Sequence, residues 1–337
     1  MKIVLDVRKD AAGYAAFQKL PGLQIVDIDS PVSEDGPREV PMDQIADADA
    51  MFCSYPPLNH IEMRKLRWIH IASTGYDQLL GQGLPARGIR ASNCRGCFDV
   101  PIAEWNIAMM VNLVRNVRQM IRNQDGAVWD RAAMFQREIR GLTVGIWGYG
   151  GIGRETARLA RQMGMKVHVF ARKGVKSRLE AFTLPGTGDP EGVLPHQVFT
   201  AGQELEFLRE LDFLVLSMPL TASTKSLIGE RELKALPRTA YVLNPARGPI
   251  IEEAALIRAL QEKWIAGAAL DTHYHYPMPP EHPLWRFPDV ILTPHISGSS
   301  LSQHYLERLW AGFNENAARF ASNRPLLNEL SAAELSA

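Results

Sequence analysis

The sequence is poor in cysteine, has no excess of either charge and contains no long apolar run. Three cysteines in 337 residues do not make a disulfide framework, so a reducing compartment such as the cytoplasm is expected. Lysine plus arginine number 37, as do aspartate plus glutamate, which leaves no basic surplus for nucleic acid or an anionic membrane. The most apolar stretch, residues 107–114, is interrupted by Asn112 and is too short to cross a bilayer.

The chain instead alternates short apolar runs with helical patterns, and its 37.6 kDa suffice for two domains. A long amphipathic helix is expected over residues 101–124, a loop over 183–200 and a last helix over 302–322. Strands alternating with helices predict an α/β fold with parallel sheets covered on both faces. The predicted strands are residues 2–7, 24–28, 50–54, 68–72, 143–147, 167–171, 213–217, 241–244, 266–270 and 290–293.

A glycine-rich segment stands between the predicted strand TVGIW and a helical pattern. Residues 148–153 read Gly-Tyr-Gly-Gly-Ile-Gly, which is the pattern G-x-G-x-x-G. In a dinucleotide-binding unit Gly148 permits the turn, Gly150 admits the pyrophosphate, and Gly153 lets helix and strand pack closely. The helix N-terminus offers N–H groups to the phosphates. We therefore predict a nicotinamide dinucleotide site here, the alternative being a glycine-rich turn in a domain that binds no ligand.

The end of the next strand bears on which dinucleotide is bound. NAD sites place Asp or Glu there to hydrogen-bond the ribose 2′-hydroxyl, whereas this strand ends in Ala171, followed by Arg172 and Lys173. An acid would repel a 2′-phosphate, while Arg172 can bind one with two hydrogen bonds. NADP is therefore expected, with NAD possible if both cations are merely solvated.

Further motifs surround this segment in a fixed order. They are IASTGYD at 71–77, NCRG at 93–96 with IAE at 102–104, MPLT at 218–221 with Thr224, NPARG at 244–248, GAALD at 267–271 and TPH at 293–295. In this order they resemble the motifs of the D-isomer-specific 2-hydroxyacid dehydrogenases, which include glyoxylate/hydroxypyruvate reductases. The resemblance implies two doubly wound domains: a flavodoxin-like substrate domain over residues 1–101 and 298–337, and a Rossmann cofactor domain over residues 102–297.

The resemblance also implies roles for particular residues. Arg247 would hold the substrate carboxylate and polarise its keto oxygen, and His295 would protonate that oxygen as hydride arrives. Asp271 would orient the nicotinamide carboxamide. The substrate-binding residues would be Thr74 and Gly75, through their backbone N–H groups, with Cys97 and Phe98 lining the pocket. The cofactor-binding residues would be Gly148, Tyr149, Gly150, Gly151, Ile152, Gly153, Arg172, Lys173, Pro219, Thr224, Pro245, Ala246, Asp271 and Gly298.

One position departs from the family pattern. The family pairs its histidine with a glutamate five residues after the aspartate, and this chain has Tyr276 at that position. A tyrosine brings no charge at pH 7, so the carboxylate that would raise the imidazole pKa is missing. Reduction would then favour mildly acidic pH, or Asp99 or Glu281 would replace the glutamate. Alternatively the substrate needs no proton relay, as with the related formate dehydrogenases.

Two short patterns invite other interpretations. Cys94 and Cys97 form a C-x-x-C, which we interpret as pocket lining because no further ligands complete a zinc site. His273 and His275 alternate with tyrosines, but no nearby acid completes a ligand set, so no metal is expected.

The expected function is reduction of a small 2-keto acid to the D-2-hydroxy acid with NADPH. The expected partners are that substrate and a second copy of the chain, since the apolar stripe of the helix over 101–124 exceeds what one small domain needs. Neither nucleic acid nor membrane is expected. The rival hypothesis is a dinucleotide-binding regulator, or inactive paralogue, that has lost turnover.

Overall fold

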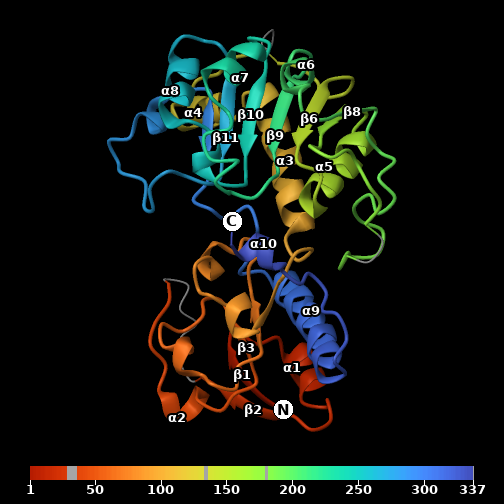
Figure 1. The fold of residues 1–337 in the computed structure, drawn as a ribbon. Helices are drawn as coiled ribbons and strands as arrows, with labels where there is room; N and C mark the ends of the chain where they lie inside the picture. The colour runs from red at the N-terminus through yellow and green to blue at the C-terminus, as the bar shows by residue number, and fades with distance from the viewer. Residues whose placement is uncertain (29–35, 133–135, 179–180, 337) are drawn as a thin grey trace. The chain divides into compact units, whose positions relative to one another are not determined.

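The computed structural model describes residues 1–28, 36–132, 136–178 and 181–336 and divides the chain into two compact units (Figure 1). Unit 1 comprises Met1–Phe98, Glu180–Thr183 and Ser300–Ala337, and unit 2 comprises Asp99–Leu179 and Leu184–Ser299. Unit 2 thus begins at Asp99 rather than residue 102 and ends at Ser299 rather than residue 297. The grouping of Glu180–Thr183 with unit 1 was not predicted.

Unit 1 is built on a five-stranded parallel sheet in the order β2-β1-β3-β4-β5, which is the flavodoxin-like order. Alternate residues of each strand enter different cores: Ile3 packs with Trp310 and Phe313, while Val4 joins a second cluster. Both faces are therefore covered, as continuous apolar strands require. The strands are β1 (Lys2–Asp6), β2 (Gln24–Asp27), β3 (Ala50–Cys53), β4 (Trp68–Ile71) and β5 (Arg90–Asn93). The helices are α1 (Ala11–Phe17), α2 (Met42–Ile45), α9 (Gln303–Ala321) and α10 (Ala332–Leu335), with 3₁₀ turns η1 (His60–Glu62), η2 (Asp77–Leu79) and η3 (Pro85–Arg87).

Unit 2 holds a seven-stranded parallel sheet in the order β12-β11-β10-β9-β6-β7-β8. Counted from its own first strand, β6, this is the Rossmann order with one strand added. The strands are β6 (Thr143–Trp147), β7 (Lys166–Phe170), β8 (Gln197–Phe199), β9 (Phe213–Leu216), β10 (Tyr241–Asn244), β11 (Gly267–Leu270) and β12 (Val290–Leu292). The helices are α3 (Asp99–Val114), α4 (Val117–Asp125), α5 (Gly151–Gln162), α6 (Glu204–Leu208), α7 (Glu230–Ala235) and α8 (Glu253–Gln261), with 3₁₀ turns η4 (Gly248–Ile250) and η5 (Pro283–Arg286). The two parallel sheets confirm the predicted fold class.

Several predictions of local structure are wrong. The single helix expected over residues 101–124 is two helices, α3 and α4, because the backbone of Asn116 is left-handed, with φ of 49°. Asparagine adopts this conformation more readily than most residues, and the apolar pattern does not reveal it. The loop expected over residues 183–200 contains β8, which pairs with β7 but is too short to show an alternating pattern. Strand β5 was not predicted.

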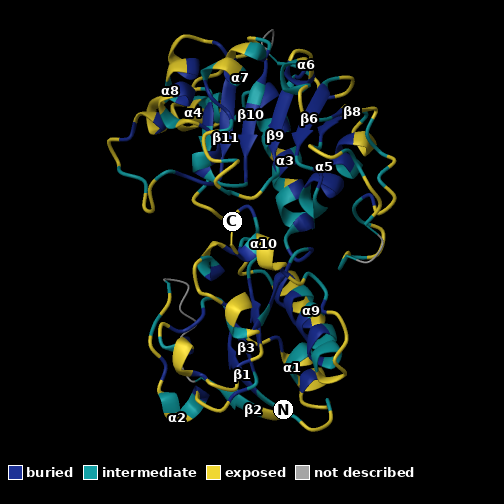
Figure 2. Ribbon diagram, in the orientation of Figure 1, coloured by how far each residue is buried: buried dark blue, intermediate teal, exposed yellow. Residues whose placement is uncertain are grey.

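Because all strands of a sheet run parallel, the loops after their carboxyl ends share one edge. In unit 2 these loops contain the glycine segment, Arg247, Asp271 and His295. Figure 2 shows most strands of the two sheets buried, while β2 is partly exposed. No described helix is long and apolar enough to cross a membrane.

Candidate functional site

The glycine segment after β6 has the steric form of a dinucleotide cradle. Gly148 has φ of 99°, and a Cβ there would lie 2.4 Å from the carbonyl oxygen of Ser217. A Cβ at Gly153 would lie 2.4 Å from the carbonyl oxygen of Gly148, where helix and strand meet. A Cβ at Gly150 would meet only the Arg178 guanidinium, at 3.9 Å. Backbone thus fills the space at two glycines and leaves the third open, as close approach of a diphosphate requires.

The side chain of Tyr149 is buried, while Gly151 and Ile152 are half-buried. The Tyr149 hydroxyl donates to Asp189, at 2.7 Å, in the loop between β7 and β8. The Asp99 carboxylate lies against Gly151 at the start of α5, where a Cβ would come within 1.9 Å of its Oδ2. The expected contribution of Tyr149 to cofactor binding would therefore come from its backbone.

The turn after β7 carries the two cations of the predicted 2′-phosphate site. Trp147 and Phe170 pair in the sheet, so this turn begins beside the glycine segment. Arg172 and Lys173 are both exposed, and neither side chain has a hydrogen bond or ion pair to another described residue. Both guanidinium and ammonium therefore point into solvent from the edge that would meet the adenosine ribose.

The loops after β9 and β10 hold other residues of the expected cofactor set. Thr224 Oγ1 donates to the Pro219 carbonyl oxygen at 2.7 Å and closes the turn after β9. Pro245 is buried, while Ala246 donates its N–H to Asn244 Oδ1 at 3.1 Å. Gly298, in the loop after β12, is half-buried.

Asp271 fastens the loop that carries His295. Its side chain is 0% exposed, and its two oxygens accept hydrogen bonds from the hydroxyls of Thr293 and Ser297 and from the backbone N–H groups of Ile296 and Ser297. The His295 N–H donates to the Asp271 carbonyl oxygen at 2.8 Å. The carboxylate expected to orient the nicotinamide therefore positions the loop that carries His295. The contribution of Ser297 was not predicted.

His295 itself has φ of 57°, a left-handed backbone that few non-glycine residues adopt. This conformation is held by the N–H contact to Asp271 and by a second one, at 3.0 Å, to the Thr293 carbonyl oxygen. Strained backbone of this kind persists where surrounding contacts enforce it, and it is common at functional sites. The loop therefore fixes the direction in which the imidazole projects.

Tyr276 lies beside His295, with ring centroids 5.6 Å apart. Its hydroxyl oxygen accepts the His273 N–H at 3.1 Å. Burial raises the pKa of Tyr276, so the phenol is neutral at physiological pH. The position predicted from the count after Asp271 is thus adjacent to the histidine, and it supplies no charge.

The surroundings of His295 lower the pKa of its imidazole. His295 is still accessible to solvent. Partial burial of its ring lowers the imidazole pKa, and the positive charge of Arg247 lowers this pKa further. Asp271 opposes both effects. The Asp99 carboxylate, one of the two candidates to replace the glutamate, lies against Gly151 at the start of α5.

Arg247 is the N-cap residue of η4, three residues after the end of β10, and is half-buried. Its Nη1 donates to the Ala246 carbonyl oxygen at 2.8 Å, and the Asn244 amide donates to the Arg247 carbonyl oxygen at 2.9 Å. Asn244, the first residue of the NPARG motif, therefore positions Arg247, a role that the sequence analysis did not assign to it. A fixed guanidinium beside an imidazole is an arrangement that can bind a carboxylate and protonate an adjacent oxygen.

The expectation that His275 has no acidic neighbour is wrong. Glu253 of α8 lies 4.0 Å from His275 Nε2 and 2.7 Å from His282 Nε2. His282 Nδ1 accepts the Leu284 N–H at 3.3 Å, so Nε2 carries the proton and donates it to Glu253. The group could offer three metal ligands, but these hydrogen bonds account for its arrangement.

The substrate-loop residues of unit 1 are also held by hydrogen bonds. Asn93 Nδ2 donates to the Thr74 carbonyl oxygen at 2.7 Å, and Ser73 Oγ donates to the Gly75 carbonyl oxygen at 2.7 Å. Gln78 Nε2 in turn donates a hydrogen bond to Ser73 Oγ at 2.9 Å. The backbone expected to cradle a carboxylate therefore has a defined shape within its unit.

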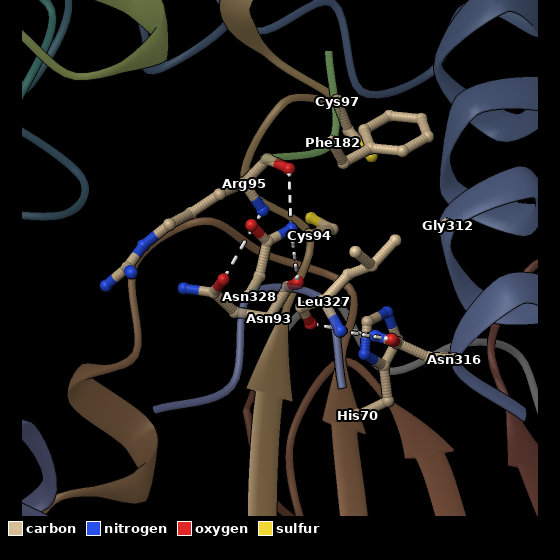
Figure 3. A pocket seen from close by; sticks show the side chains of 10 residues that line it. All are labelled: His70, Asn93, Cys94, Arg95, Cys97, Phe182, Gly312, Asn316, Leu327 and Asn328. Atoms are coloured by element: carbon tan, nitrogen blue, oxygen red, sulfur yellow. Dashed lines mark hydrogen bonds between the residues drawn. The ribbon is translucent and has the colours of Figure 1, made fainter. Parts of the chain in front are cut away.

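Cys97 is 1% exposed and lines a small interior pocket of unit 1 together with Cys94 and Phe182, with room for about one water molecule (Figure 3). Burial raises the pKa of Cys94, and its contact with the Cys97 thiol raises it further. Phe98 packs on Tyr305 at a centroid distance of 4.9 Å. Cys97 thus packs in the core of its own unit, and the buried Cys94 thiol, with its raised pKa, is unreactive.

Comparison with known proteins identifies the family. Residues 107–297 match the sequence model "D-isomer specific 2-hydroxyacid dehydrogenase, NAD binding domain". A glyoxylate reductase from Thermofilum pendens is 31% identical over 279 residues, covering 80% of this chain and 78% of the relative.

Two solved structures show the same fold. An NADPH-dependent glyoxylate/hydroxypyruvate reductase from Sinorhizobium meliloti, in complex with NADP and sulfate, has a TM-score of 0.75 at 23% identity over 99% of both chains. A D-isomer-specific 2-hydroxyacid dehydrogenase from Lactobacillus delbrueckii, in its NAD-complexed form, has a TM-score of 0.75 at 22% identity, covering 98% of this chain and 100% of that one. The chain therefore belongs to the D-isomer-specific 2-hydroxyacid dehydrogenases, oxidoreductases that transfer a hydride between a nicotinamide dinucleotide and a keto or hydroxy acid.

Proposed function

We propose that this protein reduces a small 2-keto acid to the D-2-hydroxy acid and prefers NADPH to NADH. The observation that carries the proposal is the proximity of Arg247 and His295 at the carboxyl edge of the sheet that also bears the glycine segment. That edge combines an anion-binding cation, a proton donor and a dinucleotide cradle. The Thermofilum pendens relative, a glyoxylate reductase, supports a short 2-keto acid as substrate.

The residues divide the chemistry between them. When bound, the reduced nicotinamide supplies the hydride. Arg247 binds the substrate carboxylate and stabilises negative charge on the keto oxygen. His295, in its protonated form, donates a proton to that oxygen, and in the reverse direction the neutral imidazole accepts it.

The direction of the His295 pKa shift gives the reaction a pH dependence. Burial and Arg247 lower this pKa, so the protonated fraction is small at neutral pH and grows as the pH falls. Reduction therefore speeds up toward acidic pH, because it needs the imidazolium. Oxidation of the hydroxy acid needs the neutral imidazole and is favoured at higher pH.

The preference for NADPH rests on the end of β7. No acid follows that strand, and Arg172 and Lys173 are exposed without partners among the described residues. Arg172→Ala is expected to raise the Kd for NADPH about tenfold or more and to leave the Kd for NADH nearly unchanged. Titration of both dinucleotides by calorimetry measures this, and equal weakening of both would contradict the preference.

A panel assay tests the reaction. The protein is mixed with NADPH and glyoxylate, hydroxypyruvate, pyruvate or phenylpyruvate, and the absorbance of the reduced nicotinamide is followed. Oxidation with at least one acid, giving the D-product on chiral chromatography, is expected. NADPH binding without oxidation by any acid would favour a dinucleotide-binding regulator, for which the Tyr276 substitution is the one supporting observation. Turnover of formate with NADP would instead favour chemistry that needs no proton relay.

We also propose a homodimer formed through the region of α4. Met120 and Ile121 on this helix are exposed, as are Val128 and Trp129 just after it, the latter to 90%. A cluster of exposed apolar side chains of this kind is typical of a protein contact. Sedimentation velocity should give a dimer that Trp129→Ser weakens, and a monomer for the parent protein would contradict the proposal.

A further inference from the structure

A long loop between β7 and β8 packs against the glycine segment. It spans residues 171–196, more than twice the ten to twelve residues that a crossover between parallel strands needs, and long loops of this kind commonly have a function. Asp189 anchors it: the carboxylate is buried and accepts the N–H groups of Gly192, Val193 and Leu194 at 3.0–3.1 Å, with the Tyr149 hydroxyl at 2.7 Å. Because Tyr149 belongs to the glycine segment, the loop is fastened to the predicted cofactor cradle.

Arg154 provides a second attachment from within α5. It is 5% exposed, and its guanidinium donates to the carbonyl oxygens of Tyr149, Asp189 and Lys176. The backbone N–H of Arg178 in turn donates to the Pro190 carbonyl oxygen at 2.7 Å. The part of the loop on either side of Arg178 is therefore tied to the helix that follows the glycine segment.

These attachments bring Arg178 to the open side of Gly150. Apart from the chain neighbours of Gly150, Arg178 alone among the described residues has an atom within 4 Å of where a Cβ would be. The first turn of α5 contains no acidic residue and no side-chain cap. The Asp99 carboxylate lies against Gly151 at the start of this helix. Burial is the larger cause of the lowered pKa of Arg154, and the charge of Arg178 lowers that pKa further, so the two guanidinium groups lie close together.

We propose that Arg178, presented by the loop over residues 171–196, binds the diphosphate of the dinucleotide on the open side of Gly150. A guanidinium can give a diphosphate two parallel charge-assisted hydrogen bonds. This role differs from that of Arg172, which is placed to bind the 2′-phosphate. The proposal for Arg178 rests on the proposed binding of a dinucleotide by unit 2 and not on the preference for NADPH.

Calorimetric titration of NADPH, NADH and ADP-ribose distinguishes these roles, because all three carry the diphosphate and only NADPH carries the 2′-phosphate. Arg178→Ala is expected to raise all three Kd values by a similar factor, about tenfold. Arg178→Gln, which keeps the size of the side chain, should do the same. Lys176→Ala is the matched control, since it removes a cation of the same loop whose backbone alone contacts Arg154, and it should leave all three unchanged.

Unchanged Kd values in both Arg178 variants would overturn the proposal. A weaker affinity for NADPH alone would place Arg178 on the 2′-phosphate. A weaker affinity for NADPH and NADH but not for ADP-ribose would place Arg178 near the nicotinamide. Either result would also overturn the proposal. If the parent protein binds NADH and NADPH equally, the cofactor preference fails while the comparison for Arg178 still stands. Far-ultraviolet circular dichroism of each variant shows whether the fold is retained.

Discussion

Replacing Tyr276 by glutamate restores the charge that the family pattern supplies and this chain lacks. The ring centroid of Tyr276 lies 5.6 Å from that of His295. The phenol oxygen accepts the His273 N–H, and a glutamate side chain is too short to place its carboxylate where the phenol oxygen lies. Tyr276→Glu therefore gives up this hydrogen bond and adds a negative charge beside the imidazole, whereas Tyr276→Gln gives up the same hydrogen bond without adding a charge.

The expected size of the effect follows from this separation. At 5.6 Å two unit charges attract by about 0.7 kcal/mol in water and by about 3 kcal/mol at the effective dielectric constant of about 20 found near protein surfaces. One pH unit corresponds to about 1.4 kcal/mol, so the midpoint of the pH profile should rise by about 0.5 to 2 units. His295 is open to solvent on one side, which favours the lower half of that range.

The assay is kcat/KM for keto-acid reduction across the pH range, which reports the ionisation of the free enzyme. The parent protein should lose activity as pH rises through a midpoint below the ordinary range for histidine, because burial and Arg247 lower the pKa of His295. Tyr276→Glu should move that midpoint upward, and Tyr276→Gln, which has no charge, should not. An unmoved midpoint in the glutamate variant would refute the reasoning, as would an equal rise in the glutamine variant.

Two further substitutions test the supports of the site. Asp271→Asn should cost about 1–3 kcal/mol of unfolding free energy, because the Thr293 and Ser297 hydroxyls lose a charged acceptor; chemical denaturation measures this, and an unchanged midpoint contradicts it. It should also shift the activity profile to lower pH, since Asp271 raises the pKa of His295. Gly153→Ala should cost about 1–3 kcal/mol, because a Cβ would lie 2.4 Å from a backbone oxygen. Gly312→Ala, in open space on α9, should instead stabilise by up to about 1 kcal/mol, and equal effects of the two would refute the steric account.

Most strands could be predicted because they are runs of apolar residues, whereas β5 and β8, which are short and partly polar, could not. The cradle could be predicted as well, since the spacing of Gly148, Gly150 and Gly153 reflects local backbone sterics. The position of Tyr276 followed from a count along a single loop, and its ring does lie beside His295. All three inferences depend on residues that are close in sequence.

What could not be predicted depends on residues far apart in sequence or on single backbone torsions. The contact of Glu253 with His275 joins α8 to a distant loop, and no spacing rule connects the two. The role of Asp271 is set by four hydrogen bonds across 22 to 26 residues of chain. The break at Asn116 lies in one φ angle within an otherwise continuous helical pattern.

The most direct test of the account compares keto-acid-dependent NADPH oxidation by the parent protein and by His295→Gln. The account predicts turnover by the parent and a loss of about 100-fold or more in the variant, because the proton donor is gone. NADPH binding, measured by calorimetry, should be nearly the same in both. Equal rates in the two proteins, or no turnover by the parent with any 2-keto acid, would contradict it.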